Sequence, residues 1–296
     1  MNMINFPVNV NPADYAYISF LVFCFGACMG SFLNVCIYRI PLEQSVIKPR
    51  SHCPHCKKEI AWYDNLPLFS YFILKAKCRH CGESISSRYV IVEAMTAALF
   101  LLVWLKLPIL MMPPPFALTP VFAPAIIPVF WLVVFGLALG TFVDLEHMII
   151  PDRVSLGGIV LGLVFSSLVP ALHAQPDGYG GFLSAFLGAA VGVGILWFVA
   201  VLGKLIFRKD AMGMGDVKLM GAIGAFLGWP SVLFTLLVSS FLGAGVGLTL
   251  VATGKKEMQS RIPYGPYIAL AALIWLLWGP SIWNAYLDWL IPPQNL

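Results

Sequence analysis

The chain has 296 residues, of which 59% are hydrophobic and only 11% are charged, with a mean hydropathy of +0.85. A soluble domain carries roughly 25% charged residues, so this composition excludes an ordinary soluble protein and indicates an all-α polytopic membrane protein in a lipid bilayer. The formal net charge is +4, and no nucleic-acid partner is expected. Residues 1–13 contain no basic segment, so no cleaved signal peptide is expected.

Apolar segments of about 20 residues, the length that crosses a hydrocarbon core of roughly 30 Å, predict membrane-spanning helices. Six such segments lie at about 16–38, 89–107, 124–143, 154–172, 182–203 and 266–290. A further segment, 219–253, has 35 residues and is interrupted by Gly228-Trp229-Pro230, so it is predicted to form two spans. The sequence therefore predicts about eight transmembrane helices.

The distribution of Lys and Arg supports this count. With the N-terminus outside, the predicted inner loops 39–88, 144–153, 204–218 and 254–265 hold 17 of the 18 basic residues. Treating 219–253 as one span would leave only 14 of the 18 inside. Because cytoplasmic loops of membrane proteins are enriched in Lys and Arg, eight spans fit better than seven.

The first 38 residues comprise a short lead and the first predicted helix. Gly30 and Ser31, near the end of this helix, are small enough to let another helix approach closely, and Asn34 can form a hydrogen bond across helices. These residues taken alone indicate a helix-packing face.

Residues 39–88 form a small cytoplasmic domain between the first and second helices. Cys53 and Cys56 form one C-x2-C pair, Cys78 and Cys81 form another, and 21 residues separate the pairs. This spacing is close to that of zinc ribbons, in which four thiolates hold one Zn²⁺. Thiols stay reduced in the cytoplasm, so the pattern predicts a structural zinc site.

Glu93 lies four or five residues inside the second predicted span. Its carboxylate could pair with Arg88 or Arg39, or it could face a ligand pocket. The proline-rich link 108–128 that follows the second span is predicted to be an outer loop without regular structure.

Two carboxylates are predicted to lie at the cytoplasmic ends of helices. Asp144 ends the third predicted span, and Asp216 begins the sixth, after Gly213-Met214-Gly215. An ionisable residue at the edge of a transmembrane bundle is costly and indicates a functional site. Gly213 and Gly215 carry no Cβ, and this predicts space for a substrate backbone beside Asp216. The alternative interpretation of Asp216 is a helix cap. Asp152, beside Pro151, also fits a capping position.

The predicted topology places Asp144 and Asp216 at the same face and at similar depth. Two carboxylates a few ångströms apart share one proton, so one can act as general base on water while the other protonates a peptide carbonyl. This arrangement predicts an aspartyl protease. The sequence contains no H-E-x-x-H, G-x-S-x-G or G-x-x-x-x-G-K-[ST] motif for the rival hydrolases.

Several motifs occur in the same order in one known family. They are Gly30-Ser31-Phe32-Leu33-Asn34, the two cysteine pairs, Asp144 with Pro151-Asp152, Lys209 with Gly213-Met214-Gly215-Asp216-Val217-Lys218-Leu219, and Pro263-Tyr264-Gly265-Pro266. In these motifs the sequence resembles, over nearly its whole length, the type IV prepilin peptidases, which are bacterial GxGD-type aspartyl proteases.

The resemblance implies an eight-helix, multi-pass enzyme of the bacterial inner membrane with its active site facing the cytoplasm. It implies cleavage of the basic leader of type IV prepilins and type II secretion pseudopilins, with Asp144 and Asp216 as the catalytic pair and residues 89–296 as the peptidase core. Members with cysteine pairs commonly also methylate the new N-terminal residue with S-adenosylmethionine. This implies a possible methyltransferase role for residues 39–88.

The methyl-donor site is less defined by the sequence. No Gly-rich dinucleotide-type loop follows a strand. The site is expected on the cytoplasmic face near the cysteine domain, with Asn34 and Glu93 as candidates.

Two other functions are considered. A presenilin-like intramembrane protease would carry Pro-Ala-Leu after the GxGD motif, whereas Pro170-Ala171-Leu172 lies before it and at the outer face. A transporter or assembly factor with a proton relay would distribute its acids through the membrane depth, whereas here they gather at one face.

Overall fold

The computed structural model describes residues 11–110, 123–208, 212–254 and 262–290. Within these ranges every regular element is a helix, apart from two isolated β-bridges, so the predicted all-α class is confirmed for this part of the chain. The chain divides into two compact units, Met1–Met112 and Pro113–Leu296.

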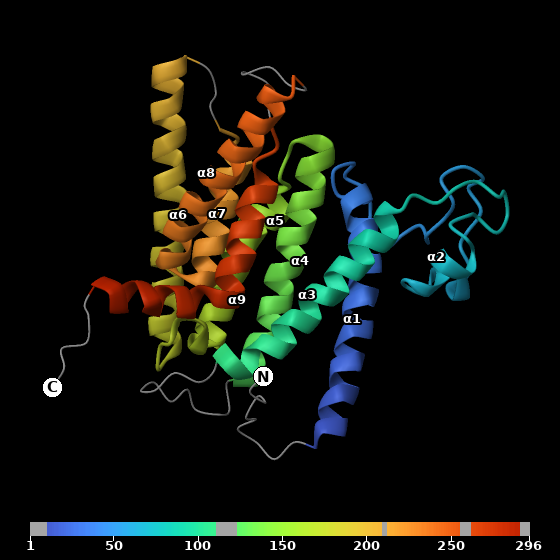
Figure 1. Cartoon of the computed structure of the whole chain (residues 1–296), viewed down its shortest axis with the longest axis horizontal. Helices are drawn as coiled ribbons and strands as arrows, with labels where there is room; N and C mark the ends of the chain where they lie inside the picture. Colours follow the sequence, from blue (N-terminus) through green and yellow to red (C-terminus); the bar gives the residue numbers. More distant parts are fainter. Residues whose placement is uncertain (1–10, 111–122, 209–211, 255–261, 291–296) are drawn as a thin grey trace. The chain divides into compact units, whose positions relative to one another are not determined.

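The first unit is built on two long helices, with a mostly irregular polar segment between them in sequence (Figure 1). Its elements are α1 (Pro12–Arg39), the 3-10 helix η1 (Trp62–Asn65), α2 (Phe69–Ile73) and α3 (Arg88–Leu110).

Glycines let α1 and α3 pack closely. A Cβ on Gly26 would lie 2.8 Å from the Cα of Ala97, and a Cβ on Gly30 would lie 2.7 Å from the Cα of Glu93. Real Cβ atoms do not approach a backbone this closely, so only glycine fits at these two positions. The predicted packing role of Gly30 is therefore confirmed.

In its described residues the second unit is a bundle of six helices and one 3-10 helix. Its elements are α4 (Ala123–His147), α5 (Asp152–Leu168), η2 (Pro170–His173), α6 (Gly178–Phe207), α7 (Met214–Leu227), α8 (Trp229–Ala252) and α9 (Gly265–Leu290).

Helix α7 lies at the centre of this bundle, and nearly every residue from Val217 to Phe226 is buried. It packs on α5, where a Cβ on Gly162 would lie 2.6 Å from the Cβ of Ala225. It also packs on α6, where a Cβ on Gly192 would lie 2.5 Å from the carbonyl oxygen of Met220. Small residues on both neighbours thus allow α7 to be enclosed by helices.

Six of the described helices are long and apolar enough to cross a membrane, so the chain is a multi-pass membrane protein. They are α1, α3, α4, α6, α8 and α9. The predicted break in 219–253 is confirmed: α7 ends at Leu227, Gly228 adopts a φ of 78°, and α8 begins at Trp229. Because α5 has 17 residues and α7 has 14, neither is among the six.

The predicted irregular link 108–128 is partly wrong. Helix α3 continues to Leu110 and α4 begins at Ala123, so both ends of the link are helical. Pro124 lies in the first turn of α4, where a proline costs no helical hydrogen bond. The middle of the link, residues 111–122, lies outside the described residues, as do Lys209 and residues 255–261 of the predicted inner loop 254–265.

Candidate functional site

The four predicted metal-binding cysteines come together in the first unit. The sulfur atoms of Cys53, Cys56, Cys78 and Cys81 all lie within 4.8 Å of one another. The two pairs are built alike, because the amide of Lys57 donates to the carbonyl of Cys53 and the amide of Gly82 donates to the carbonyl of Cys78. Lys57 and Gly82 both have positive φ, of 58° and 73°.

The cysteine geometry fits a tetrahedral metal ion. Zinc–sulfur bonds of about 2.3 Å put two thiolates of a tetrahedron about 3.8 Å apart. The Sγ atoms of Cys53 and Cys81 are 3.8 Å apart. Hydrogen bonds from the backbone amides of Cys81 and His80 lower the pKa of the Cys78 thiol to about 6, which favours the thiolate that a metal requires.

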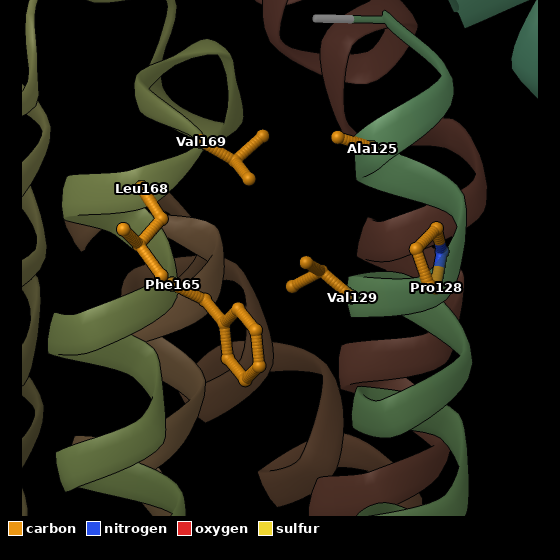
Figure 2. A pocket seen from close by; sticks show the side chains of 6 residues that line it. All are labelled: Ala125, Pro128, Val129, Phe165, Leu168 and Val169. Atoms are coloured by element: carbon orange, nitrogen blue, oxygen red, sulfur yellow. The ribbon is translucent and has the colours of Figure 1, made fainter.

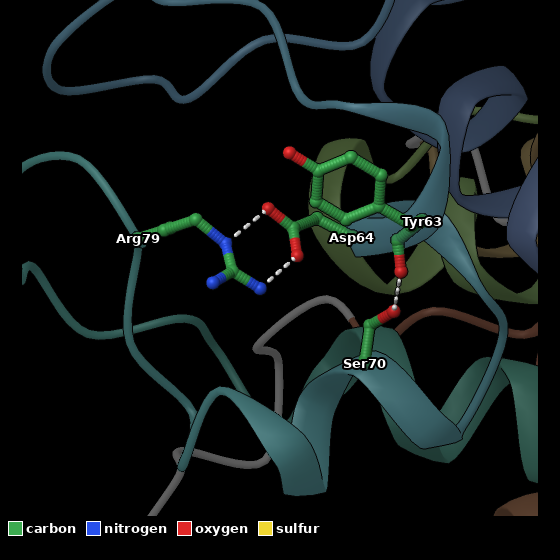
Figure 3. A network of polar contacts seen from close by, with 4 residues as sticks. All are labelled: Tyr63, Asp64, Ser70 and Arg79. Carbon is green, nitrogen blue, oxygen red and sulfur yellow. Dashed lines mark hydrogen bonds and ion pairs between the residues drawn. The ribbon is translucent and has the colours of Figure 1, made fainter.

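Polar contacts stabilise the segment between the two cysteine pairs. Arg79 donates from Nε and from an Nη to the two carboxylate oxygens of Asp64, over 2.7 and 2.6 Å (Figure 3). This paired hydrogen bond is the main reason that the pKa of Asp64 lies below its usual range. Ser70 in α2 donates to the carbonyl of Tyr63 in η1 over 3.3 Å. These contacts join the second cysteine pair to η1 and α2.

Glu93 connects this segment to α3. Its Oε2 accepts a hydrogen bond from the backbone amide of Leu68 over 2.8 Å, and Ser31 of α1 also contacts the carboxylate. Leu68 has φ 65° and ψ −53°, and the amide of Phe69 donates to the carbonyl of Pro67, which makes this a strained γ-turn. Arg39, one of the two arginines considered as a partner for Glu93, donates from Nη1 to the carbonyl of Ser45 over 3.0 Å.

Asn34 is buried, with 3% of its surface exposed. Its amide nitrogen donates to the carbonyls of Tyr89, over 3.1 Å, and Gly30, over 3.4 Å. Among the described residues, none donates a hydrogen bond to its Oδ1. Buried polar atoms are nearly always paired, so this orphan acceptor is an unusual feature of the α1–α3 contact.

Asp144 lies in the last turn of α4 with only 5% of its surface exposed. The backbone amide of Gly265, at the start of α9, donates to its Oδ2 over 2.9 Å. A Cβ on Gly265 would lie 2.8 Å from the same oxygen. The carboxylate is therefore held by a residue 121 positions later in the chain, at a contact that only glycine permits.

Asp216 is the third residue of α7, and its carboxylate interacts electrostatically with that of Asp144. It also accepts a hydrogen bond from the backbone amide of Gly213, the N-cap residue. This contact is the half of a capping box that an acid at the third position makes. The structure thus brings Asp144 and Asp216 into one site, and Asp216 also has the helix-capping contact that was considered as its alternative role.

The two motif glycines have different surroundings. A Cβ on Gly215 would lie 3.1 Å from the Cβ of Ile150, so this glycine lets α7 approach the loop between α4 and α5. A Cβ on Gly213 would lie 3.3 Å from Oδ2 of Asp216. The role of these glycines beside a bound substrate stays a prediction.

Asp152 does not cap α5 as predicted. Pro151 is the N-cap residue, and Asp152 is the first residue of the helix. Its Oδ1 instead accepts a hydrogen bond from Nζ of Lys218 in α7 over 2.6 Å. Because Lys218 is two residues after Asp216, this ion pair links α5 to the start of α7 close to the two carboxylates.

Sequence reasoning missed the contribution of the Pro263-Tyr264-Gly265-Pro266 segment to the site. Its prolines and glycine predict only an irregular helix start. In the structure Gly265 binds Asp144, while the hydroxyl of Tyr264 lies 2.8 Å from Oγ of Ser239 in α8. The sequence signal that could have found this contact is the clustering of two prolines around Gly265.

Two family models match the chain. One describes a bacterial peptidase A24 N-terminal domain and matches residues 24–107, and the other describes the type IV leader peptidase family and matches residues 131–248. The first match covers the cysteine pairs and the second covers both Asp144 and Asp216. No solved structure matches the chain.

The curated relatives include several proteins named prepilin leader peptidase/N-methyltransferase. One from Aeromonas hydrophila is 36% identical over 299 residues, covering 90% of this chain and 93% of its own length. One from Myxococcus xanthus is 40% identical over 239 residues, covering 80% of this chain and 65% of its own length. One from Legionella pneumophila is 31% identical over 306 residues, covering 95% of this chain and 99% of its own length. With matches of this extent, the chain belongs to the type IV leader peptidase family.

Proposed function

We propose that this protein is a membrane aspartyl endopeptidase that cleaves the leader peptide of type IV prepilins and then N-methylates the new N-terminal residue. The single observation that carries the peptidase activity is the meeting of Asp144 and Asp216 at the ends of two helices of one unit. Family membership supports the choice of substrate, and the names of the relatives support the second activity.

The two carboxylates perform acid–base catalysis on a water molecule. They hold one proton between them, so one carboxylate removes a proton from the attacking water and the other protonates the peptide carbonyl. The backbone amide of Gly265 donates a hydrogen bond to Oδ2 of Asp144 and so fixes the orientation of this carboxylate. Asp216 lies in the first turn of α7, where its carboxylate accepts a hydrogen bond from the backbone amide of Gly213.

The site faces the cytoplasm of a bacterial inner membrane. An eight-span topology adds α5 and α7 to the six longer helices and puts 17 of the 18 basic residues inside. In this topology the end of α4 and the start of α7 lie at the same cytoplasmic face. The family resemblance described above also implies pseudopilins of type II secretion as substrates, because they carry the same kind of basic leader.

The cysteine cluster holds a structural zinc ion, and the methyl-donor site lies in the same unit. Four thiolates close a tetrahedral site and leave no open position for catalysis by the metal. S-adenosylmethionine supplies the methyl group when bound. Asn34 and Glu93 are the candidate residues for binding it. The unpaired Oδ1 of Asn34 can accept a hydrogen bond, whereas the described contacts of Glu93 are with Leu68 and Ser31.

Mass spectrometry of a prepilin N-terminus tests both activities together. The substrate is incubated in lipid vesicles with and without the purified protein and with S-adenosylmethionine. The expected product has lost its leader and gained one methyl group. An intact leader after incubation with the folded protein would refute the peptidase proposal, and a cleaved but unmethylated product would refute the methyltransferase proposal.

A further inference from the structure

Helix α2 exposes an apolar face outside the membrane-spanning helices. Phe69, Phe72 and Ile73 are 67%, 69% and 69% exposed. Phe72 and Ile73 lie three and four residues after Phe69, so the three side chains share one face of the helix, whereas Ser70 is buried. Exposed apolar residues are expected on α1 and α6, because these helices cross the membrane, but α2 has only five residues. The apolar face of α2 therefore needs a partner of its own.

Apolar side chains inside the second unit face other helices. Between α4 and α5, for example, they line a cavity of about 260 Å³ (Figure 2). Val129 of α4 and Phe165 of α5 both point into the space between these two helices. At α2, by contrast, the large exposed fractions show that the described residues leave the apolar face open.

The hydrogen bond between Leu68 and Glu93 determines the depth at which α2 lies. Glu93 is five residues into the membrane-spanning helix α3, so it lies roughly 7.5 Å along the helix axis from Arg88, the first residue. Leu68 is the N-cap residue of α2, and its amide donates to Glu93 over 2.8 Å. Figure 1 accordingly shows α2 level with part of α1 and not beyond either end of that helix. The polar layer of a bilayer occupies roughly 5 to 8 Å on each side of the hydrocarbon core, so α2 begins at the depth of this layer.

The turn that leads into α2 is held in place. Leu68 has φ 65° and ψ −53°, a strained conformation that persists only where the surrounding contacts enforce it. Besides the bond from Leu68 to Glu93, the amide of Ser70 donates to the carbonyl of Leu66 over 3.0 Å, and its hydroxyl donates to the carbonyl of Tyr63. These contacts keep α2 at a fixed place beside α3.

The segment that carries α2 is basic. Residues 39–88 hold nine Lys and Arg and four Asp and Glu, and a Zn²⁺ ion with four thiolates would lower this excess of five positive charges by two. Lys75 and Lys77 follow α2 directly, and both are exposed. Trp62 of the same segment is 79% exposed, and Trp is enriched at membrane–water interfaces. Apolar and aromatic side chains next to Lys are typical of helices that lie in the interface of a membrane with anionic lipid.

We propose that the α2 face, defined as Phe69, Phe72 and Ile73, inserts into the boundary between headgroups and acyl chains of the bilayer that α1 and α3 cross. Lys75 and Lys77 then contact anionic lipid headgroups. Lys77 directly precedes Cys78, so this insertion holds the cysteine cluster against the membrane surface. The inference concerns lipid binding and does not rest on the proposed enzymatic activities.

Lipid fits the α2 face better than the proposed substrate does. Both ends of residues 39–88 continue into membrane-spanning helices, so the segment stays at the bilayer surface whatever else it binds. The leader of the proposed prepilin substrate is basic according to the family resemblance, and like charges on two surfaces disfavour their contact. An anionic bilayer surface matches both the apolar face and the positive charge of the segment.

Spin labels on the full chain in vesicles test the insertion. Because the chain has seven cysteines, the label is attached to p-acetyl-phenylalanine, which replaces either Phe72 or, as the control, Glu59, an exposed residue beside the first cysteine pair. The vesicles contain phosphatidylcholine and phosphatidylglycerol, and thermal unfolding verifies that both labelled proteins are folded. Electron paramagnetic resonance then measures collisions of each label with oxygen, which concentrates in the bilayer, and with a water-soluble nickel chelate.

The label at position 72 is expected to collide mainly with oxygen and the label at position 59 mainly with the nickel chelate. Equal collision rates with the nickel chelate at the two positions would overturn the inference. Protection of position 72 that arises only when prepilin is added would assign the α2 face to the substrate, and would overturn it as well.

Charge substitutions test the contact with anionic lipid. Lys75→Gln combined with Lys77→Gln is expected to raise collisions of the position-72 label with the nickel chelate several-fold, because α2 loses its attraction to the headgroups. Lys57→Gln combined with Lys58→Gln removes the same charge beside the first cysteine pair and is expected to leave those collisions unchanged. Equal effects of the two pairs of substitutions would overturn the assignment of Lys75 and Lys77 to the lipid surface.

Discussion

The orientation of the Asp144 carboxylate is fixed by Gly265, a residue far from it in the sequence. This carboxylate is almost fully buried, and the amide of Gly265 donates to Oδ2. Tyr264, the preceding residue, contacts Ser239 through its hydroxyl, so α8 supports the backbone that carries this amide. The orientation of the carboxylate thus depends on a backbone donor.

Gly265→Ala is predicted to impair leader cleavage. The new Cβ would lie 2.8 Å from Oδ2 of Asp144 and would push the carboxylate out of position. A displacement of about 1 Å at a catalytic group can cost on the order of 10²-fold in rate. The measurement is kcat/KM for prepilin cleavage in vesicles. Gly245→Ala on α8, where a Cβ meets nothing within 4 Å, is the control and should cleave normally. Equal rates for the two variants would show that this contact does not position Asp144.

At the scale of elements, His173 of η2 contacts both α5 and α7 through hydrogen bonds. Nε2 of His173 lies 2.9 Å from Oγ of Ser166 in α5 and 3.1 Å from the carbonyl of Ala225 in α7. The Ser166 hydroxyl also donates to the carbonyl of Ala225 over 3.2 Å. These three groups join α5, η2 and α7 at the end of α7 opposite Asp216.

The His173 contacts predict a pH dependence of stability. Burial lowers the pKa of His173 below its ordinary value of 6.5, so the folded protein favours the neutral imidazole. In the unfolded chain the imidazole takes up a proton near pH 6.5, so stability falls as the pH drops from there toward the folded-state pKa. In detergent, the thermal midpoint should fall between pH 7.5 and pH 5.5 by about 2 °C more for the wild type than for His173→Gln. Identical shifts in both proteins would contradict this role of His173.

At the scale of the whole molecule, local patterns were predicted well and long-range contacts were not. The cysteine site follows from C-x2-C spacing, because each pair is a tight turn that brings two sulfurs together. The break before α8 follows from Gly228, because φ is positive there. The placement of Asp144 and Asp216 at one face is the long-range exception: it was predicted from counting spans, since the two crossings between them, an even number, return the chain to the same face.

The contacts that sequence reasoning missed depend on packing. The Gly265 amide reaches Asp144 only because α9 begins beside the end of α4, and no local pattern encodes that placement. Asp152 was assigned to a cap because acids favour helix starts. In the structure Pro151 takes the N-cap position with φ −60° and ψ 139°, and Lys218 from α7 provides Asp152 with a charged partner. Similarly, no pattern in the sequence marks Leu68 as a partner, yet its backbone amide donates a hydrogen bond to Glu93.

The most direct test of the proposed dyad replaces each of its carboxylates in turn. Asp144→Asn and Asp216→Asn preserve side-chain shape and remove the acid–base function. The matched control is Asp152→Asn, an exposed acid that lies near Asp216 through its ion pair with Lys218. Mass spectrometry of the prepilin N-terminus in vesicles is the readout for all three purified variants, after thermal unfolding has shown that each is folded. The dyad predicts that Asp144→Asn and Asp216→Asn slow cleavage about 10³-fold or more while Asp152→Asn still removes the leader. Full cleavage by folded Asp144→Asn or Asp216→Asn would contradict it.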